Sequence, residues 1–232
     1  MELRDPVSSA SHLLTAVWAA YATLLLLRLS PPQAGRKIAV AVFGLSMVLL
    51  YAASGTFHGV PFTRAENPDE FRFFQKLDQS AIYLLIAGTN TPCLAILLGG
   101  RRAKWFLGLM WLIAFTGIAC MWLFPKVPHE LTVALFVGMG WLGVLPVRSY
   151  YRAVGWRAMN WMWLGGGLYT LGAVFELTEW PFISSGPIRL GYHEMFHLAD
   201  IAASVAFFMF VLRCVLNYQA RAVEPERRRL AA

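Results

Sequence analysis

The sequence predicts an all-α polytopic membrane protein, a seven-transmembrane-helix bundle that forms one domain over residues 1–232. Of the 232 residues, 58% are hydrophobic and only 14% are charged, whereas a soluble domain carries roughly a quarter charged residues. The apolar residues are gathered in long runs, and a span needs roughly 20 of them to cross a bilayer core about 30 Å thick. The runs that approach this length lie at about 11–29, 38–58, 78–98, 105–124, 130–147, 158–177 and 193–216.

Local features support these runs in chain order. The first run follows a segment without the basic region and cleavage site of a secretory signal, so we expect it to remain as a span. The second run ends in SGTFHG, and the third opens at Asp78. Tryptophans near the ends of the fourth and sixth runs indicate an aromatic belt, and the fifth lies between Glu130 and Arg148. Gly165–Gly167 in the sixth run suits a close helix contact, and the seventh opens with YHEMFHLAD.

The net charge of +7 is distributed unevenly along the chain. An odd number of crossings places the termini on opposite sides, with six of the twenty lysines and arginines on the N-terminal side and fourteen on the other. The positive-inside rule then predicts an N-terminus outside a bacterial-type plasma (inner) membrane and a cytoplasmic C-terminus. Because the membrane accounts for the basic residues, we expect no nucleic acid partner.

Polar residues within the spans are the most informative feature, because ionisable groups there usually face a bundle interior or a cavity. Ser54 and His58 end the second run, Asp78 opens the third, and His193 and His197 open the seventh. All these run ends lie on the N-terminal side. Distant segments therefore bring their polar groups to one side of the membrane at a similar depth.

The spacing of these residues predicts a zinc (Zn²⁺) site. His193 and His197 are four residues apart, so they lie on one helix face, and His58 can approach from a facing helix. Three histidine ligands leave a fourth position for water, as in catalytic zinc sites. Asp78 and Ser54 would then orient or deprotonate that water, with Asp78 the better base because a serine hydroxyl titrates far outside the useful range.

Each residue also has a simpler interpretation when it is taken alone. His58 can be a hydrogen-bonded core histidine, Asp78 can be a helix N-cap, and Ser54 can serve small-residue packing. Asp200, one turn beyond His197, either hydrogen-bonds a ligand imidazole or bonds to another helix.

Two histidines and the cysteines carry less information. His12 and His129 fall on the same side as the other histidines, and their roles stay open. The three cysteines lack metal-ligand spacing and form no disulfide framework.

Several segments together resemble the hemolysin III branch of the progestin and adiponectin receptor family, which is related to the alkaline ceramidases. They are SGTFHG, LDQSAIYLLIAGTNTP, GGGLYTLGAVFE and HEMFHLADIAAS, and SASHLLTA is similar to the family's first helix. The likeness covers nearly the whole chain. It implies zinc ligands at His58, His193 and His197, a water-positioning carboxylate at Asp78, and a water or oxyanion contact at Ser54. The related receptors and ceramidases are linked to amide hydrolysis of ceramide-type lipids.

The chain departs from the family pattern at two positions and in its orientation. Asn90 stands where the family commonly has an aromatic residue, and Asp200 stands where an apolar residue is usual. Adiponectin receptors place the zinc on the cytoplasmic side, whereas the charge count here places it outside, in agreement with an alkaline-ceramidase-like orientation.

The leading hypothesis is a zinc-dependent integral membrane hydrolase of a lipid amide or ester, with a zinc-bound water as nucleophile and a membrane lipid as substrate or ligand. One alternative is a non-enzymatic receptor-like or regulatory protein in which a structural zinc ties the second and seventh spans together. A cytolytic protein is another, although no charged stripe suits a channel, and a haem protein would show a Soret band. Neither the substrate nor the oligomeric state follows from the sequence.

Overall fold

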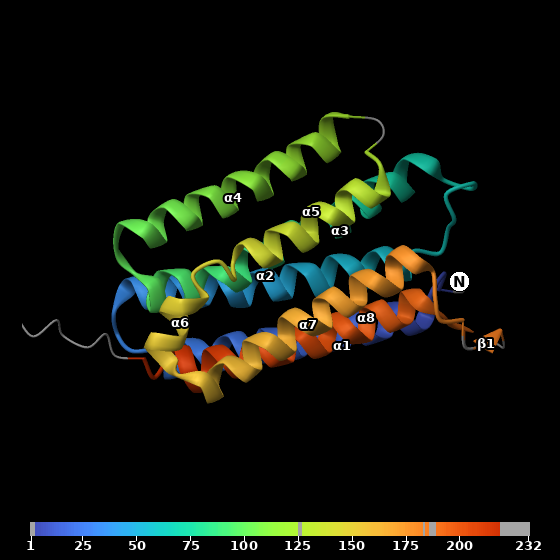
Figure 1. The fold of residues 1–232 in the computed structure, drawn as a ribbon. Helices are drawn as coiled ribbons and strands as arrows, with labels where there is room; N and C mark the ends of the chain where they lie inside the picture. The colour runs from blue at the N-terminus through green and yellow to red at the C-terminus, as the bar shows by residue number, and fades with distance from the viewer. Residues whose placement is uncertain (1–2, 125–126, 183, 186–188, 219–232) are drawn as a thin grey trace, which may run out of the picture.

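The structure, a computed structural model, describes residues 3–124, 127–182, 184–185 and 189–218. Within these ranges the chain forms helices that run back and forth along one axis (Figure 1). The helices are α1 (Pro6–Leu29), α2 (Ala34–Gly59), α3 (Pro68–Pro92), α4 (Gly100–Leu123), α5 (His129–Leu142), α6 (Val147–Val154), α7 (Trp156–Thr178) and α8 (Tyr192–Phe210). Lys126 and the arginines after residue 218, which entered the charge count, lie outside the described residues.

Short irregular elements extend or connect these helices. α3 continues into a π-helical segment, η1 (Cys93–Leu98), and α8 continues into η2 (Val211–Val215). Between α7 and α8, β1 (Ser184–Ser185) pairs antiparallel with β2 (Arg189–Leu190). This small hairpin lies at the same end of the bundle as the N-terminus (Figure 1).

The predicted all-α membrane architecture is confirmed, with five or six candidate spans among the described helices. Five helices are long and apolar enough to cross a membrane, namely α1, α2, α3 with η1, α4, and α8 with η2. The pair α5 and α6 makes a sixth if this pair, bent by 46°, is one span. α7 has 23 residues but is not among these candidate spans.

Two helix boundaries differ from the sequence-based expectation. α3 begins at Pro68, ten residues before Asp78, and its N-cap is Asn67, whose side chain accepts a hydrogen bond from the Glu70 amide. The interpretation of Asp78 as an N-cap is therefore wrong; the early turns of α3 were missed because they are polar. The helix of the fifth run ends at Leu142. Pro146 follows four residues later, and because proline lacks an amide hydrogen it interrupts helical hydrogen bonding.

The larger apolar core lies mainly among α1, α2, α3, α7 and α8, and a smaller one joins α3, α4 and α5. Gly44 of α2 faces Thr23 of α1, and Gly88 of α3 faces Ser46 of α2; a Cβ at either glycine would collide with the hydroxyl-bearing side chain opposite. Such small residues let membrane helices approach closely. α4 is packed more sparsely than α3. Only 17% of an apolar 18-residue stretch of α4 is buried, against 61% for the corresponding stretch of α3.

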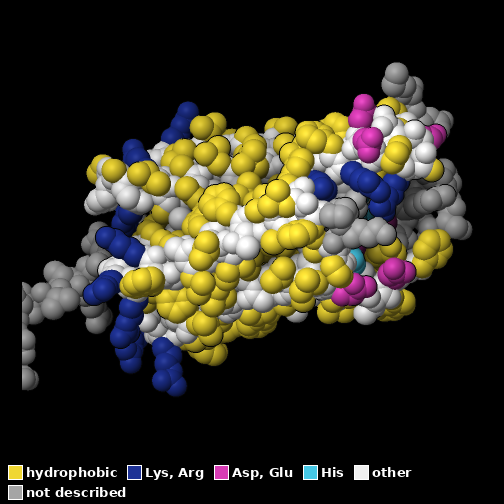
Figure 2. All heavy atoms as spheres, turned by 90° about the horizontal axis from the view of Figure 1, so that it is seen from above, with side chains coloured by type: hydrophobic (Ala, Val, Ile, Leu, Met, Phe, Trp, Pro, Cys, Tyr) yellow, Lys and Arg dark blue, Asp and Glu magenta, His cyan; other side chains and the backbone are white. Residues whose placement is uncertain are grey.

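The two ends of the bundle differ in charge. Figure 2 shows most lysine and arginine side chains at the end that carries α6, and most aspartate and glutamate side chains at the opposite end, beside a visible histidine. Apolar side chains cover the surface between them (Figure 2). This band is the surface expected to face lipid.

Candidate metal centre

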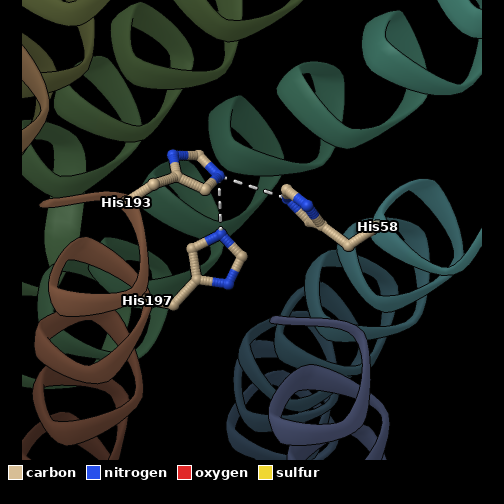
Figure 3. A group of neighbouring side chains, drawn as sticks. All are labelled: His58, His193 and His197. Carbon is tan, nitrogen blue, oxygen red and sulfur yellow. Dashed lines mark hydrogen bonds between the residues drawn. The ribbon is translucent and has the colours of Figure 1, made fainter. Parts of the chain in front are cut away.

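The structure brings together the three histidines that the spacing had grouped (Figure 3). His58 lies in the last turn of α2, and His193 and His197 lie in the first turns of α8. The Nε2 atom of His193 is 3.3 Å from Nε2 of His58 and 3.1 Å from Nε2 of His197. One ring nitrogen from each histidine lies within 4.8 Å of the other two. We call these residues the histidine cluster.

Local hydrogen bonds hold the helix ends that carry this cluster. The Gly191 amide donates to Glu194 Oε2 at 2.8 Å, which fixes the first turn of α8. The Asp5 amide donates to the His58 carbonyl oxygen at 3.0 Å, and the Ser9 hydroxyl donates to the Gly55 carbonyl oxygen at 2.8 Å. The N-terminal segment is thereby fastened to the end of α2.

Two carboxylates contact the outer nitrogens of the cluster. Asp5 Oδ2 lies 3.0 Å from Nδ1 of His58, and Glu176 Oε2 lies 3.0 Å from Nδ1 of His193. An ionised carboxylate only accepts hydrogen bonds, so each Nδ1 carries a proton, and each ring, when it is neutral, presents a lone pair at Nε2. The lone pairs of His58 and His193 therefore face each other across 3.3 Å. Two lone pairs at this distance repel each other. Only a proton or a cation between the two nitrogens makes the contact attractive.

The geometry of the cluster fits a metal ion. Zinc binds histidine nitrogen at about 2.0–2.1 Å, and tetrahedral angles then separate neighbouring nitrogens by roughly 3.3 Å. The observed separations of 3.1 and 3.3 Å match this value. Carboxylates on the far nitrogens are typical of metal-bound histidines, because they fix the tautomer and raise ligand basicity. The histidine cluster can therefore hold a metal ion with an open coordination position.

Neither Asp5 nor Glu176 was assigned to the site from the sequence. Partial burial raises the pKa of the Asp5 carboxyl, but hydrogen bonds with His58 and Arg4 outweigh this effect and hold the pKa at about 2. Arg4 Nε donates to Asp5 Oδ2 at 2.8 Å, and its guanidinium lies 4.3 Å from the centre of the Phe57 ring. Asp5 is therefore ionised at neutral pH. For Glu176 a signal existed, since it ends the sixth run on the side where His193 begins the seventh.

The other residues predicted for the site lie beside the cluster. Ser54 lies one turn before His58 on α2 and is buried. Asp78 lies on α3, ten residues after the start of that helix. Asp78 lines the same cavity as His193 and Glu176.

The two remaining histidines lie next to the cluster without joining it. The buried His12 ring stacks on the His197 ring, with centroids 3.9 Å apart and planes 21° apart. Neither nitrogen of His12 has a hydrogen-bond partner among the described residues. His129 Nε2 lies 3.6 Å from Glu176 Oε1. Glu176 thus links His129 to His193.

The structure does not support the interpretation that Asp200 hydrogen-bonds a ligand imidazole. Within the described part of the chain it makes no hydrogen bond to a histidine, and its Oδ2 atom is buried without a partner. Its backbone oxygen accepts a hydrogen bond from the Tyr51 hydroxyl at 3.2 Å.

A cavity of about 710 Å³ extends from the histidine cluster among α3, α5, α7 and α8. Asp78, Glu176 and His193 line one end, and Cys93 and Trp163 line the other. Most of its wall is apolar, from residues such as Ile82, Leu85, Ile86, Val133, Phe136, Met162 and Phe207. Its size falls within the range of small-molecule sites.

The helical bundle and its buried histidine cluster define a class of protein: a polytopic membrane protein with a candidate metal site at one end. The family model of haemolysin-III related proteins matches residues 2–208, and the chain belongs to this family. The resemblance stated from the sequence motifs is thereby confirmed.

Similar proteins come from bacteria and mammals. The chain is 33% identical to hemolysin-3 of Bacillus cereus over 184 residues, which cover 79% of this chain and 78% of the relative. It is 31% identical to a hemolysin-3 homolog of Bacillus subtilis (strain 168) over 182 residues, or 78% and 77% of the two chains. The human monocyte to macrophage differentiation factor is 27% identical over 199 residues, or 85% and 79%.

Proposed function

We propose that this protein is a zinc-dependent membrane hydrolase of a lipid amide or ester. The observation that carries the proposal is the open histidine cluster beside Asp78, at the end of a long apolar cavity. His58, His193 and His197 would hold the ion, since neutral imidazole nitrogens suit zinc. When bound there, zinc supplies a Lewis acid and lowers the pKa of water to about 7.

Asp78 is the residue we assign to proton transfer. Its carboxylate lines the cavity next to His193, where it can accept the proton of an attacking water as a general base. The hydroxyl of Ser54, buried one turn before His58 on α2, can orient that water or donate to the carbonyl oxygen of the substrate. Asp5 and Glu176 would act through the histidines, by fixing the orientation of the two imidazoles they contact.

The cavity supports a lipid as the substrate. Its apolar wall runs from Asp78 at the site to Trp163 near the other end of the bundle, so a hydrocarbon chain can lie inside while its amide or ester meets the histidine cluster. The hydrophobic effect favours such burial by roughly 0.8 kcal/mol per CH₂ group.

The membrane arrangement is part of the proposal. We infer seven crossings, with the bent pair α5 and α6 and the less apolar α7 added to the five apolar helices. The concentration of arginine and lysine at the α6 end (Figure 2) supports a cytoplasmic location for that end and an outside location for the histidine cluster. Green fluorescent protein fused to the C-terminus should fluoresce in bacterial cells, and alkaline phosphatase fused there should be inactive. The reverse pattern would contradict the orientation.

The test of the hydrolase is lipid turnover by the purified, zinc-loaded protein. We expect fatty acid release from ceramide or phospholipid, and a fall of about 10²-fold or more in Asp78→Asn, because general base catalysis contributes on that order. Asp69→Asn, in the first turn of the same helix and exposed, is the matched control and should keep full activity. Metal content should be equal in all three proteins.

Two outcomes would overturn the hydrolase. Zinc-loaded wild-type protein without activity on a broad panel of ceramides and phospholipids would leave zinc with a structural role between α2 and α8. Equal turnover by wild-type protein and Asp78→Asn would remove the assigned base.

A further inference from the structure

A second group of polar side chains lies deeper in the bundle than the histidine cluster. It is contributed by α2, α3, α7 and α8 and comprises Tyr51, Thr89, Tyr169, Asp200 and Ser204. The Tyr51 hydroxyl donates to Ser204 Oγ at 2.7 Å, and the Tyr169 hydroxyl lies 2.8 Å from the same atom. The serine and the two tyrosines therefore satisfy one another.

Two atoms of this group remain without a partner. Asp200 Oδ2 and Thr89 Oγ1 are buried and have no hydrogen bond within the described residues, and the residues are only 7% and 4% exposed. A buried polar atom left unpaired is destabilising, so each such atom calls for an explanation.

Thr89 differs from most of the other helical threonines. Thr15, Thr23, Thr56, Thr91, Thr170 and Thr178 each donate to the carbonyl oxygen four residues earlier. Thr89 makes no such bond, although a backbone acceptor is the usual partner of a threonine within a helix. Its hydroxyl proton is therefore available to another group.

Both unpaired residues line the 710 Å³ cavity. Thr89 belongs to α3 and Asp200 to α8. Asp200 lies seven residues after His193, which places it roughly 10 Å further along the helix axis. The cavity continues past the pair to Met162 and Trp163. A ligand that fills the cavity would therefore have apolar surroundings on both sides of this pair.

We propose that the lipid chain bound in this cavity carries a hydroxyl group partway along its length, and that Asp200 and Thr89 bind it. A hydroxyl has one donor and two acceptor positions, so it can donate to Asp200 Oδ2 while it accepts from the Thr89 hydroxyl. An unsubstituted chain would leave both atoms unpaired. The inference rests on the proposed function for the presence of a lipid chain, and it narrows the substrate to hydroxylated lipids.

The test compares the binding of stearic acid with that of mid-chain hydroxystearic acid, by displacement of a fluorescent fatty acid from the full-length protein in detergent. We expect the hydroxylated acid to bind about tenfold more tightly, which corresponds to about 1.4 kcal/mol from its two hydrogen bonds. Asp200→Leu and Thr89→Val should each reduce this preference, and the double variant should abolish it. Ser204→Ala is the matched control, because it alters the same polar group away from the cavity wall and should keep the preference.

Equal affinity of the two acids for the wild-type protein would overturn the inference, as would a preference that survives in the double variant. If neither acid displaces the probe, the cavity does not take a chain and the inference also fails. Stabilisation of the wild-type protein by sodium chloride over choline chloride, without a preference between the acids, would assign the pair to a cation instead. Binding needs no turnover, so a failed hydrolysis test with an intact hydroxyl preference would overturn the hydrolase alone.

Discussion

The two ends of the bundle use charged side chains in opposite ways. At the end with the N-terminus, two acidic residues contact histidines of the cluster, Asp5 with His58 and Glu176 with His193. At the other end lysines and arginines project from the surface (Figure 2), and Arg36 donates to the carbonyl oxygen of Tyr218 at 2.6 Å. The first arrangement can hold an ion between helices, whereas the second suits contact with water and lipid headgroups.

The largest effect is expected from removal of a cluster histidine. His58→Ala or His193→Ala should abolish stoichiometric zinc in the purified protein, because two imidazoles do not complete the site. Metal analysis by mass spectrometry measures this. His129→Ala is the matched control, since His129 contacts Glu176 but lies outside the cluster. Equal metal loss in His129→Ala would contradict the assignment of ligands.

The carboxylates that contact the cluster should have a smaller effect on metal binding. Loss of such a partner typically lowers metal affinity 10–100-fold, and we expect this for Glu176→Gln and Asp5→Asn in a competition with a zinc chelator. The Glu176 side chain is less exposed than that of Asp5, 18% against 39%, so Glu176→Gln should have the larger effect. Glu66→Gln, at an exposed position of the same end, should bind zinc like the wild type.

A change in the packed middle should affect stability without affecting the metal. Gly44→Val introduces a side chain against Thr23 of α1, and overpacking of this kind destabilises by about 1–3 kcal/mol. Thermal unfolding in detergent should show the loss, while zinc content stays at the wild-type level. The control is Gly35→Ala, because a Cβ at Gly35 meets no atom within 4 Å. Metal loss in folded Gly44→Val would mean that the histidine end depends on this contact.

The smallest effect belongs to the basic end. Arg36→Ala removes the hydrogen bonds to the Leu216 and Tyr218 carbonyl oxygens, and we expect a loss of about 1 kcal/mol, the usual net value for a hydrogen bond. Thermal unfolding would measure it, with Lys37→Ala, exposed on the same helix, as the comparison. A shift in zinc affinity in Arg36→Ala would show that the two ends are not independent.

The features predictable from the sequence were those with a strong local signal. Long apolar runs predict helices, and a four-residue spacing predicts that His193 and His197 share a helix face. The meeting of these histidines with His58 also followed, because alternating crossings return the ends of the second and seventh runs to one side. The polar start of α3 and the break after Leu142 were missed, since apolar content alone sets neither boundary.

The carboxylate partners were harder to predict because they depend on contacts between distant segments. Asp5 reaches His58 across 53 positions in the sequence, which requires the N-terminal segment to fold onto the end of α2. No spacing rule relates Glu176 to His193, because the chain leaves α7 and returns through a hairpin before α8 begins. The unpaired state of Asp200 and Thr89 likewise depends on how four helices pack around a cavity.

The sparse packing of α4 has an evolutionary consequence. Only 17% of an apolar 18-residue stretch of α4 is buried, against 61% for α3. Most of its residues therefore face acyl chains, against which any apolar side chain packs equally well. Exchanges among leucine, isoleucine, phenylalanine and valine should therefore accumulate freely along its outward face. Among descendants of this protein, the amino-acid sequence of α4 should diverge fastest, while the helix keeps its length and its apolar character.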